Sequence, residues 1–383
     1  MDLQIHLYKP QAIETELQDK LLSIVERAFP STNAQRPQVL SHFVGSRSYC
    51  IVASISSQPV AFLFFQSRTA LSSGTELSLL SVGPVATDPN FQRRGIGSQL
   101  IGYLNSYAVE SNVDLIILSG IPDYYTKYGF YPFMVKSKIS ISHHNLSKVV
   151  STALPEVCID KKILCKADLS PITYGTEKFG ITRSSDDWDW LLITHPDSYY
   201  FPNPVFLSQG LKSQTTPQFY SAQYFSDKTL IREFHASNNH DAQALLTHLV
   251  HTSSNHSFYE FYTSYNSTLF RFLLSRIPFQ FSAYPHPKAR ALMKIINPSV
   301  VSTWTNSTSH PLSEILDSPK LTSHLSNLLL EDTGNCLEYY LPGLLSGLWS
   351  FPNLEIRNNE PKFSIVAPLL SNIPPFVYQG DAL

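Results

Sequence analysis

The pattern of apolar and polar positions predicts a mixed sheet of strands and helices in the first third of the chain. Apolar residues recur at helical spacing over 11–28, whereas the runs that follow are shorter and rich in β-branched and aromatic residues, as in strands. The longest strand, over 76–87, is interrupted by Gly83-Pro84, a pair that marks a bulge or the end of strand pairing. In chain order the other predicted elements are strands over 49–55 and 60–65, a helix over 98–110 and a strand over 113–118.

A similar order of elements is predicted farther along the chain. Its members are strands over 204–209, 218–225 and 229–235, a helix over 241–251, a strand over 258–263, a helix over 267–275, and strands over 278–284 and 291–296. This order matches that of residues 49–140 and predicts an internal repeat of fold without clear repetition of sequence. Apolar periodicity weakens over 135–160, and the pattern changes again after Pro298. We therefore expect three units, at 1–145, 146–297 and 298–383.

Composition and charge exclude several classes of protein. Of the 383 residues 43% are hydrophobic and 15% are charged, and the net charge is −2, so the chain is globular and lacks the basic excess of a nucleic-acid binder. The four cysteines are scattered without a CxxC pair, which argues against disulfides and structural zinc. The N-terminus has no apolar signal segment, and no run reaches the ~18 apolar residues of a membrane span. We expect a cytoplasmic protein without a metal, without a membrane span and without a nucleic-acid partner; the oligomeric state stays open, a homo-oligomer included.

The chemistry-bearing segment lies between the strand over 76–87 and the helix that follows it. It reads Gln92-Arg93-Arg94-Gly95-Ile96-Gly97. Its two glycines let the backbone approach a ligand closely, and the helix start offers unpaired N–H groups and a positive dipole end. With two arginines beside it, the segment predicts a cradle for a diphosphate. It is neither a P-loop nor the GxGxxG dinucleotide fingerprint, since both motifs are absent.

Two stretches resemble the signatures of the GCN5-related N-acetyltransferase (GNAT) superfamily. Residues 82–101, VGPVATDPNFQRRGIGSQLI, resemble its acetyl-CoA motif, Q/R-x-x-G-x-G/A after a bulged strand, and residues 124–130, YYTKYGF, resemble its Y-x-K/R-x-G-F signature. The resemblance covers residues 1 to about 140. It implies an α/β (α+β) fold with a bulged, splayed mixed sheet, and acetyl-CoA as co-substrate. One departure is Leu118-Ser119-Gly120, where many members have an Asn.

The resemblance also implies a cofactor site. The strand with Gly83-Pro84 is expected to splay from its neighbour over 113–118, so that the pantetheine arm enters the gap. The diphosphate is expected on the backbone amides over 93–98, and an N–H of Val85 or Ala86 can polarise the thioester carbonyl. The expected cofactor-binding residues are Val85, Ala86, Thr87, Gln92, Arg93, Arg94, Gly95, Ile96, Gly97 and Ser98.

Catalytic candidates follow from the same resemblance. Tyr125 occupies the Tyr of Y-x-K-x-G-F, which in the family commonly protonates the departing coenzyme A thiolate; the alternative is a Tyr that only packs against Phe130 and Phe133. Ordinary pKa values of ~8.5 for a thiol and ~10 for a phenol make this proton transfer feasible. For the base that takes the proton of the amine, Glu76 is one candidate, with a surface carboxylate as the alternative, and Asp123 is a second.

The whole layout resembles the enhanced-intracellular-survival type of tandem acetyltransferases. The similar phrases are AQYFSDKTLIREFHA (222–236), ALMKIINPSV (291–300) and the terminal PPFVYQGDAL. Such proteins have an active acetyltransferase domain, a degenerate second one and a small α+β domain like sterol carrier protein 2. Because their C-terminal carboxylate can act as the base, Leu383 is a third candidate. In the second repeat the corresponding junction between strand and helix, residues 235–241, contains no glycine, so its backbone cannot approach a diphosphate in the same way. We therefore expect the second domain to be structural or to shape the substrate site.

The predicted function is acetyl transfer from acetyl-CoA to a primary amine by direct attack in a ternary complex. No cysteine lies near the motif, so a covalent acetyl-enzyme is not indicated. The acceptor is a small-molecule amine or, in a second reading, a protein lysine. A third reading is an inactive scaffold that binds a small or apolar ligand. The intact Gln92, Gly95, Gly97 and Tyr125 favour an active enzyme.

Overall fold

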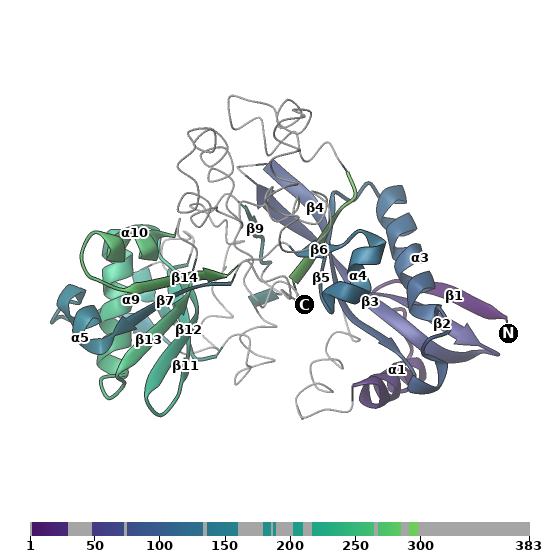
Figure 1. The fold of residues 1–383 in the computed structure, drawn as a ribbon, viewed down its shortest axis with the longest axis horizontal. Coiled ribbons are helices and arrows are strands. Elements are labelled where there is room, and N and C mark those ends of the chain that lie inside the picture. The colour runs from purple at the N-terminus through teal and green to yellow at the C-terminus, as the bar shows by residue number, and fades with distance from the viewer. Residues whose placement is uncertain are drawn as a thin grey trace, which may run out of the picture.

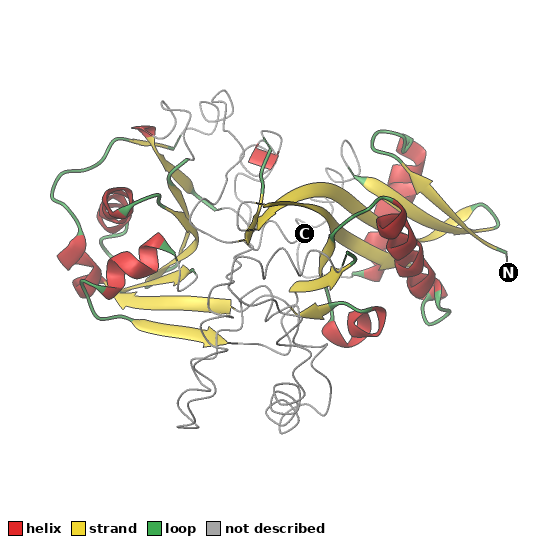
Figure 2. Cartoon of the chain, turned by 90° about the horizontal axis from the view of Figure 1, so that it is seen from above, coloured by secondary structure: helices red, strands yellow, loops and turns green. Residues whose placement is uncertain are grey.

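The computed structural model describes residues 2–29, 48–72, 75–132, 136–159, 179–184, 187–188, 202–209, 217–263, 267–284 and 291–297. Within these ranges the chain forms two mixed sheets with helices packed on them, which lie at opposite ends of the molecule in both views (Figures 1 and 2). The predicted α/β fold with two such sheets is confirmed. The third predicted unit, 298–383, lies outside the described residues. No described helix combines the length and the apolar character needed to cross a membrane.

The first sheet belongs to the part of the chain that contains residues 92–97, the predicted diphosphate site. Its strand order is β1 (Leu3–Tyr8), β2 (Tyr49–Ile55), β3 (Gln58–Ser72), β4 (Thr75–Thr87), β5 (Leu115–Ser119), β15 (Ala291–Ile295) and β6 (Tyr131–Pro132), and β9 (Phe179–Ile181) pairs with the end of β3. Its helices are α1 (Thr15–Ala28), α3 (Ile96–Glu110) and α4 (Pro122–Tyr125), with the 3₁₀ turns η1 (Pro89–Phe91) and η2 (Thr126–Tyr128). The predicted strands and helices of residues 11–118 are confirmed, with boundaries shifted by up to seven residues.

Alternation along β3 explains why helices cover both faces of this sheet. Phe62 and Phe64 are fully buried on the face that packs against α1. Leu63 and Phe65 point the other way and pack in the cluster that includes α3. Because successive side chains of a strand point to opposite faces, an uninterrupted apolar run such as residues 60–65 of β3 can only be satisfied between two layers.

The second sheet repeats the order of elements of the first. Its strands are ordered β14 (Gln280–Tyr284), β7 (Lys136–Ser142), β13 (Phe258–Tyr262), β12 (Lys228–His235), β11 (Phe219–Tyr224), β10 (Pro204–Leu207) and β8 (Val157–Cys158). Helices α5 (His143–Leu146), α9 (Asn239–Thr252) and α10 (Thr268–Leu274) and the turn η3 (Ser147–Val149) contribute to its core. The series β10-β11-β12-α9-β13-α10-β14 matches β2-β3-β4-α3-β5-α4-β6, so the predicted repeat of fold is confirmed.

The two repeats exchange one strand with each other. Strand β7 follows β6 in the chain but lies in the second sheet, between β13 and β14. Strand β15 follows β14 but lies in the first sheet, between β5 and β6. The boundaries 1–145 and 146–297 remain a prediction, and no single cut in the sequence gives each sheet all of its strands.

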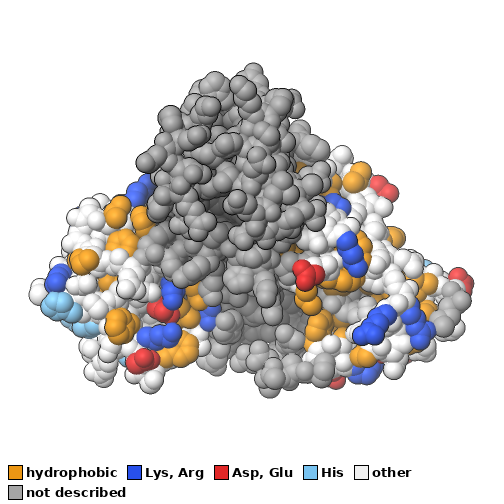
Figure 3. Space-filling view, in the orientation of Figure 1, with side chains coloured by type: hydrophobic (Ala, Val, Ile, Leu, Met, Phe, Trp, Pro, Cys, Tyr) orange, Lys and Arg blue, Asp and Glu red, His pale blue; other side chains and the backbone are white. Residues whose placement is uncertain are grey.

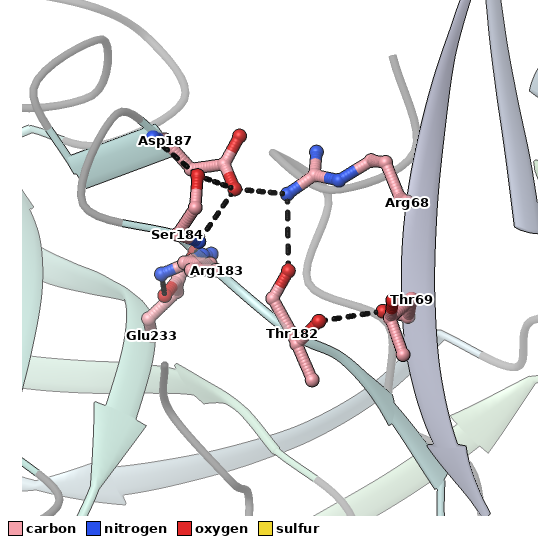
Figure 4. Close-up of polar contacts among 7 residues, drawn as sticks. All are labelled: Arg68, Thr69, Thr182, Arg183, Ser184, Asp187 and Glu233. Carbon is pink, nitrogen blue, oxygen red and sulfur yellow. Dashed lines mark hydrogen bonds and ion pairs between the residues drawn. The ribbon is translucent and has the colours of Figure 1, made fainter. Parts of the chain in front are cut away.

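A short segment around β9 connects the two sheets (Figure 4). Thr182 donates its backbone N–H to the carbonyl of Thr69 on β3 at 2.8 Å. The next residue, Arg183, forms a two-pronged ion pair with Glu233 on β12, with N–O distances of 2.8 and 2.9 Å, and both side chains are buried. Breaking such a buried pair by removing one partner typically costs about 3–5 kcal/mol, so this connection holds the repeats together.

Candidate functional site

Strands β4 and β5 separate at the Gly-Pro pair. Phe65 pairs with Val82 and Leu63 with Val85, so Gly83 and Pro84 together face the single Phe64 of β3 as a bulge. Parallel pairing between β4 and β5 ends at Val82 and Leu118, and no described strand pairs with this edge of β4 beyond that point. The predicted bulge and splay are confirmed. Backbone groups of residues 83–87 therefore line an edge where an extended ligand can add.

The loop between β4 and α3 is held by its own side chains. Asp88 accepts a hydrogen bond from the Asn90 amide at 2.9 Å, and Arg94 donates to the Asn90 carbonyl at 3.0 Å. Gln92 donates its side-chain amide to the carbonyl of Thr87 at 3.0 Å. Gln92 thus ties the loop to the end of β4, which brings the two predicted groups of cofactor residues, 85–87 and 92–98, together.

Helix α3 begins without a side-chain cap, directly after an exposed loop. Gly95 is its N-cap residue at φ +78°, a left-handed conformation that glycine adopts without strain, and no side chain caps the helix. Its first turn contains no acidic residue, and residues 92–95 are exposed while Ile96 is buried. The free N–H groups and the helix dipole favour an anion here. On the face shown in Figure 3, Lys and Arg side chains (blue) are visible over the first sheet and its helices, together with Asp and Glu side chains (red).

An ion pair that the sequence pattern did not reveal braces this loop from α1. Arg27 contacts the Asp88 carboxylate through Nη2 at 2.7 Å and Nε at 3.1 Å. Burial alone would raise the pKa of Asp88, but the hydrogen bonds from Asn90 and Arg27 outweigh it and hold the pKa below its usual value. The carboxylate therefore stays ionised and keeps the loop anchored at neutral pH.

Tyr125 lies on α4, packed among aromatic rings beside the splay. It is 8% exposed, and its ring centroid is 4.9 Å from that of Tyr124 and 6.0 Å from that of Phe130. Burial, with a smaller contribution from Tyr128, raises the pKa of Tyr125 to about 12. The Tyr125 ring thus packs against Phe130, while Phe133 lies outside the described residues. The same packing keeps the phenol protonated, as a proton donor must be.

The neighbouring tyrosines reach the start of α3. The hydroxyl of Tyr128 lies 2.5 Å from Oγ of Ser98, and a Cβ at Gly97 would come within 2.5 Å of the Tyr124 hydroxyl. Burial raises the pKa of Tyr124; for Tyr128 burial acts in the same direction, but hydrogen bonds with Ser98, Tyr124 and Lys127 outweigh it and lower the pKa. The two signature motifs of the sequence are thus in direct contact, and a side chain at Gly97 would collide with the Tyr124 hydroxyl.

Gly120 makes room for the ring of Tyr125. A Cβ at this position would lie 2.2 Å from Cε2 and 2.7 Å from Cδ2 of that ring. The sequence showed Gly120 only as a departure from the family pattern just after β5, without the reason for it. The structure identifies it as the residue that shapes the pocket of Tyr125.

Gly120→Ala is therefore expected to displace the Tyr125 ring. Overpacking a filled site costs about 1–3 kcal/mol, and a misplacement of about 1 Å can reduce turnover by about 10²-fold. We expect the variant to stay folded and bind acetyl-CoA, with kcat reduced at least about tenfold, as steady-state kinetics can measure. Gly102→Ala, on the exposed face of α3 with nothing within 4 Å, is the control and should leave kcat unchanged. Equal kcat in the two variants would contradict this role for Gly120.

The three base candidates lie in different parts of the chain. Glu76 is exposed near the start of β4, seven residues before Gly83, and at ~3.3 Å per residue about 23 Å of strand separates them. That distance argues against Glu76 as a base at the thioester. Asp123 is exposed in the first turn of α4, close to Tyr125 in the chain. Leu383 lies outside the described residues.

Comparison with known proteins matches this geometry. Residues 46–132 match the family model of the acetyltransferase (GNAT) domain, a range that contains β2 to β5, the loop, α3 and the Tyr125 turn. The predicted superfamily is confirmed for this domain. No curated protein gives a significant sequence match.

Solved structures share the fold of this chain over most of its length. A GCN5-related N-acetyltransferase from Kribbella flavida is similar over 78% of this chain and 73% of its own, with 13% identity and a TM-score of 0.60. One from Anabaena variabilis has 15% identity and a TM-score of 0.57 over 78% and 74% of the two chains. Eis1 from Mycobacterium abscessus has 11% identity and a TM-score of 0.56 over 78% and 75%. At these identities the likeness concerns the fold, and it confirms the predicted resemblance to the tandem layout.

Proposed function

We propose that this protein is an acetyl-CoA-dependent N-acetyltransferase that transfers the acetyl group to a primary amine by direct attack in a ternary complex. One observation carries the proposal: the splay between β4 and β5 leads directly into the open N-terminus of α3. The free edge over 83–87 suits the amide-rich pantetheine arm, and the amides over 93–98 suit the diphosphate. The acceptor is a small-molecule amine or a protein lysine.

Residues at the splay divide the proposed reaction between them. The amine nitrogen attacks the thioester carbon while an N–H of Val85 or Ala86 stabilises the developing oxyanion. The C–S bond breaks, and Tyr125 protonates the departing sulfur. A thiol of ordinary pKa ~8.5 is a weak acceptor for a phenol near 12, but desolvation in the same slot raises the pKa of the thiol too. The proton of the amine goes to a base, for which Asp123 and Leu383 remain candidates.

The raised pKa of Tyr125 predicts a pH profile. A group with a raised pKa in the folded protein keeps its protonated form until the pH passes through that value, here about 12. We expect kcat/KM to rise with pH up to about pH 11 as the amine, of ordinary pKa ~10.4, loses its proton, with no falling limb below that pH. Blank-corrected thiol release from acetyl-CoA measures this. A falling limb centred below pH 10 in the wild type but absent in Tyr125→Phe would contradict the assignment.

A screen of amines tests the proposed function. Small-molecule amines and lysine-containing peptides are offered with acetyl-CoA; thiol release and a mass increase of one acetyl group on the acceptor are the two readouts. The Gly95→Glu variant, which is expected not to bind acetyl-CoA, is the control for non-enzymatic acetylation. Acetylation by the wild type alone supports the proposal. Tight binding of acetyl-CoA without transfer to any amine would favour the inactive scaffold instead. We propose a cytoplasmic location, because the four cysteines are scattered along the sequence without the close spacing typical of a disulfide framework.

A further inference from the structure

Strand β15 brings residues of the second repeat under the Tyr125 turn. Its Leu292 pairs with Leu118 of β5 on one side and with Pro132 of β6 on the other. Leu292 is fully buried in the cluster that also contains Tyr125 and Phe130. One wall of the Tyr125 pocket is therefore supplied by a segment that follows it by more than 160 residues.

Lys294 on this strand contacts the end of the turn directly. Its Nζ donates to the backbone carbonyl of Tyr128 at 2.8 Å and lies 5.8 Å from the ring centroid of Phe130. A Cβ at Gly129, which ends the turn at φ +83°, would lie 3.4 Å from Cε of Lys294. The side chain is half-buried, and burial lowers the pKa of Lys294. The ammonium group thus satisfies a carbonyl at a helical C-terminus, where carbonyls lack partners and positive charge is favourable.

We propose that Lys294 is a positioning residue that fixes the turn 122–130 and thereby holds Tyr125 at the splay. The turn is closed on itself by the Phe130 amide, which donates to the carbonyl of Tyr125 at 3.3 Å, and by Gly129, which donates to Thr126 at 2.9 Å. The Tyr128 hydroxyl links the same turn to Ser98 in the first turn of α3. The catalytic consequence rests on the proposed function; the contact itself does not. This role explains what the second repeat contributes to the first site.

Hydrogen exchange tests the contact independently of activity. In the full-length protein, Lys294→Met removes the donor and keeps the apolar stem, so the amides of Gly129 and Phe130 are expected to exchange at least about tenfold faster. Lys138→Met is the matched control: Lys138 lies on β7, the strand exchanged in the opposite direction, and pairs with Glu260 at 2.7 Å. Lys138→Met should leave the hydrogen-exchange rates of residues 122–130 unchanged. Unchanged exchange there in Lys294→Met overturns the proposal. If Lys294→Met does not fold, Lys294→Gln, too short to reach, takes its place.

Kinetics test whether the contact acts through Tyr125. Lys294→Met should lower kcat about tenfold and change the KM for acetyl-CoA little, and Lys294→Arg, which keeps a charged donor, should recover most of the loss. In the Tyr125→Phe background, Lys294→Met should lower kcat no further, because the Tyr125 hydroxyl that Lys294 positions is already absent. An equal loss in both backgrounds overturns the role. If the wild type acetylates no amine, the proposed function fails, and the exchange experiment still decides whether Lys294 holds the turn.

Discussion

Tyr125→Phe is expected to lower turnover by about 10²–10⁴-fold, the usual contribution of a positioned general acid. The substitution keeps the ring and its packing against Tyr124 and Phe130, and removes only the hydroxyl. Binding of acetyl-CoA should change little, because the diphosphate does not need that hydroxyl. The loss should therefore appear in kcat, measured by thiol release with a confirmed amine.

Tyr124→Phe is the control for this substitution. Tyr124 is adjacent in sequence, and its hydroxyl lies against Gly97 in the first turn of α3. Loss of the Tyr124 hydroxyl should lower kcat much less than loss of the Tyr125 hydroxyl. Turnover of Tyr125→Phe equal to that of the wild type would rule out the acid role and leave water or another group to protonate the thiolate.

Gly95→Glu is expected to abolish binding of acetyl-CoA in a folded protein. At φ +78° any L side chain is strained by about 1–3 kcal/mol. A new carboxylate at the start of α3 would also face the diphosphate, and juxtaposed like charges cost several kcal/mol, which corresponds to at least about a 100-fold loss in affinity. Calorimetric titration measures the affinity, and thermal unfolding reports the fold.

Gly102→Glu adds the same charge to the same helix at a different place. Gly102 is exposed on α3, with nothing within 4 Å of a Cβ and no positive φ. This variant should bind acetyl-CoA with near-normal affinity. Normal affinity in both variants would remove the basis for placing the diphosphate at the start of α3.

The parts of this site that the sequence predicted are local in the chain. The bulge follows from the Gly83-Pro84 pair within its strand, and the open helix start follows from Gly95 and its neighbours. Each depends on the conformational limits of a few consecutive residues, which the sequence states directly. The spacing along β4 that argues against Glu76 as the base also follows from the sequence, once its position on the strand is converted into a length.

The contacts that complete the site join residues far apart in the chain. Arg27 meets Asp88 across 61 residues, and Lys294 meets Tyr128 across 166. The apolar run of β15 suits a central strand of either sheet, so its pattern cannot say that it is exchanged into the first one. Gly120 has an ordinary place after a strand, and only the ring of Tyr125 explains it.

The stoichiometry of acetyl-CoA binding to the full-length chain tests the central claim most directly. The first repeat has the splay and the open helix start; the second keeps a bulge and a splay, with Arg232 in place of the Gly-Pro pair. In the second repeat Asn238 caps the amide of Asp241 at 3.0 Å, and that carboxylate occupies the first turn of α9. Calorimetric titration should therefore give one site per chain, lost in Gly95→Glu and retained in Gly102→Glu. Two sites per chain, or one site that survives Gly95→Glu, would contradict it.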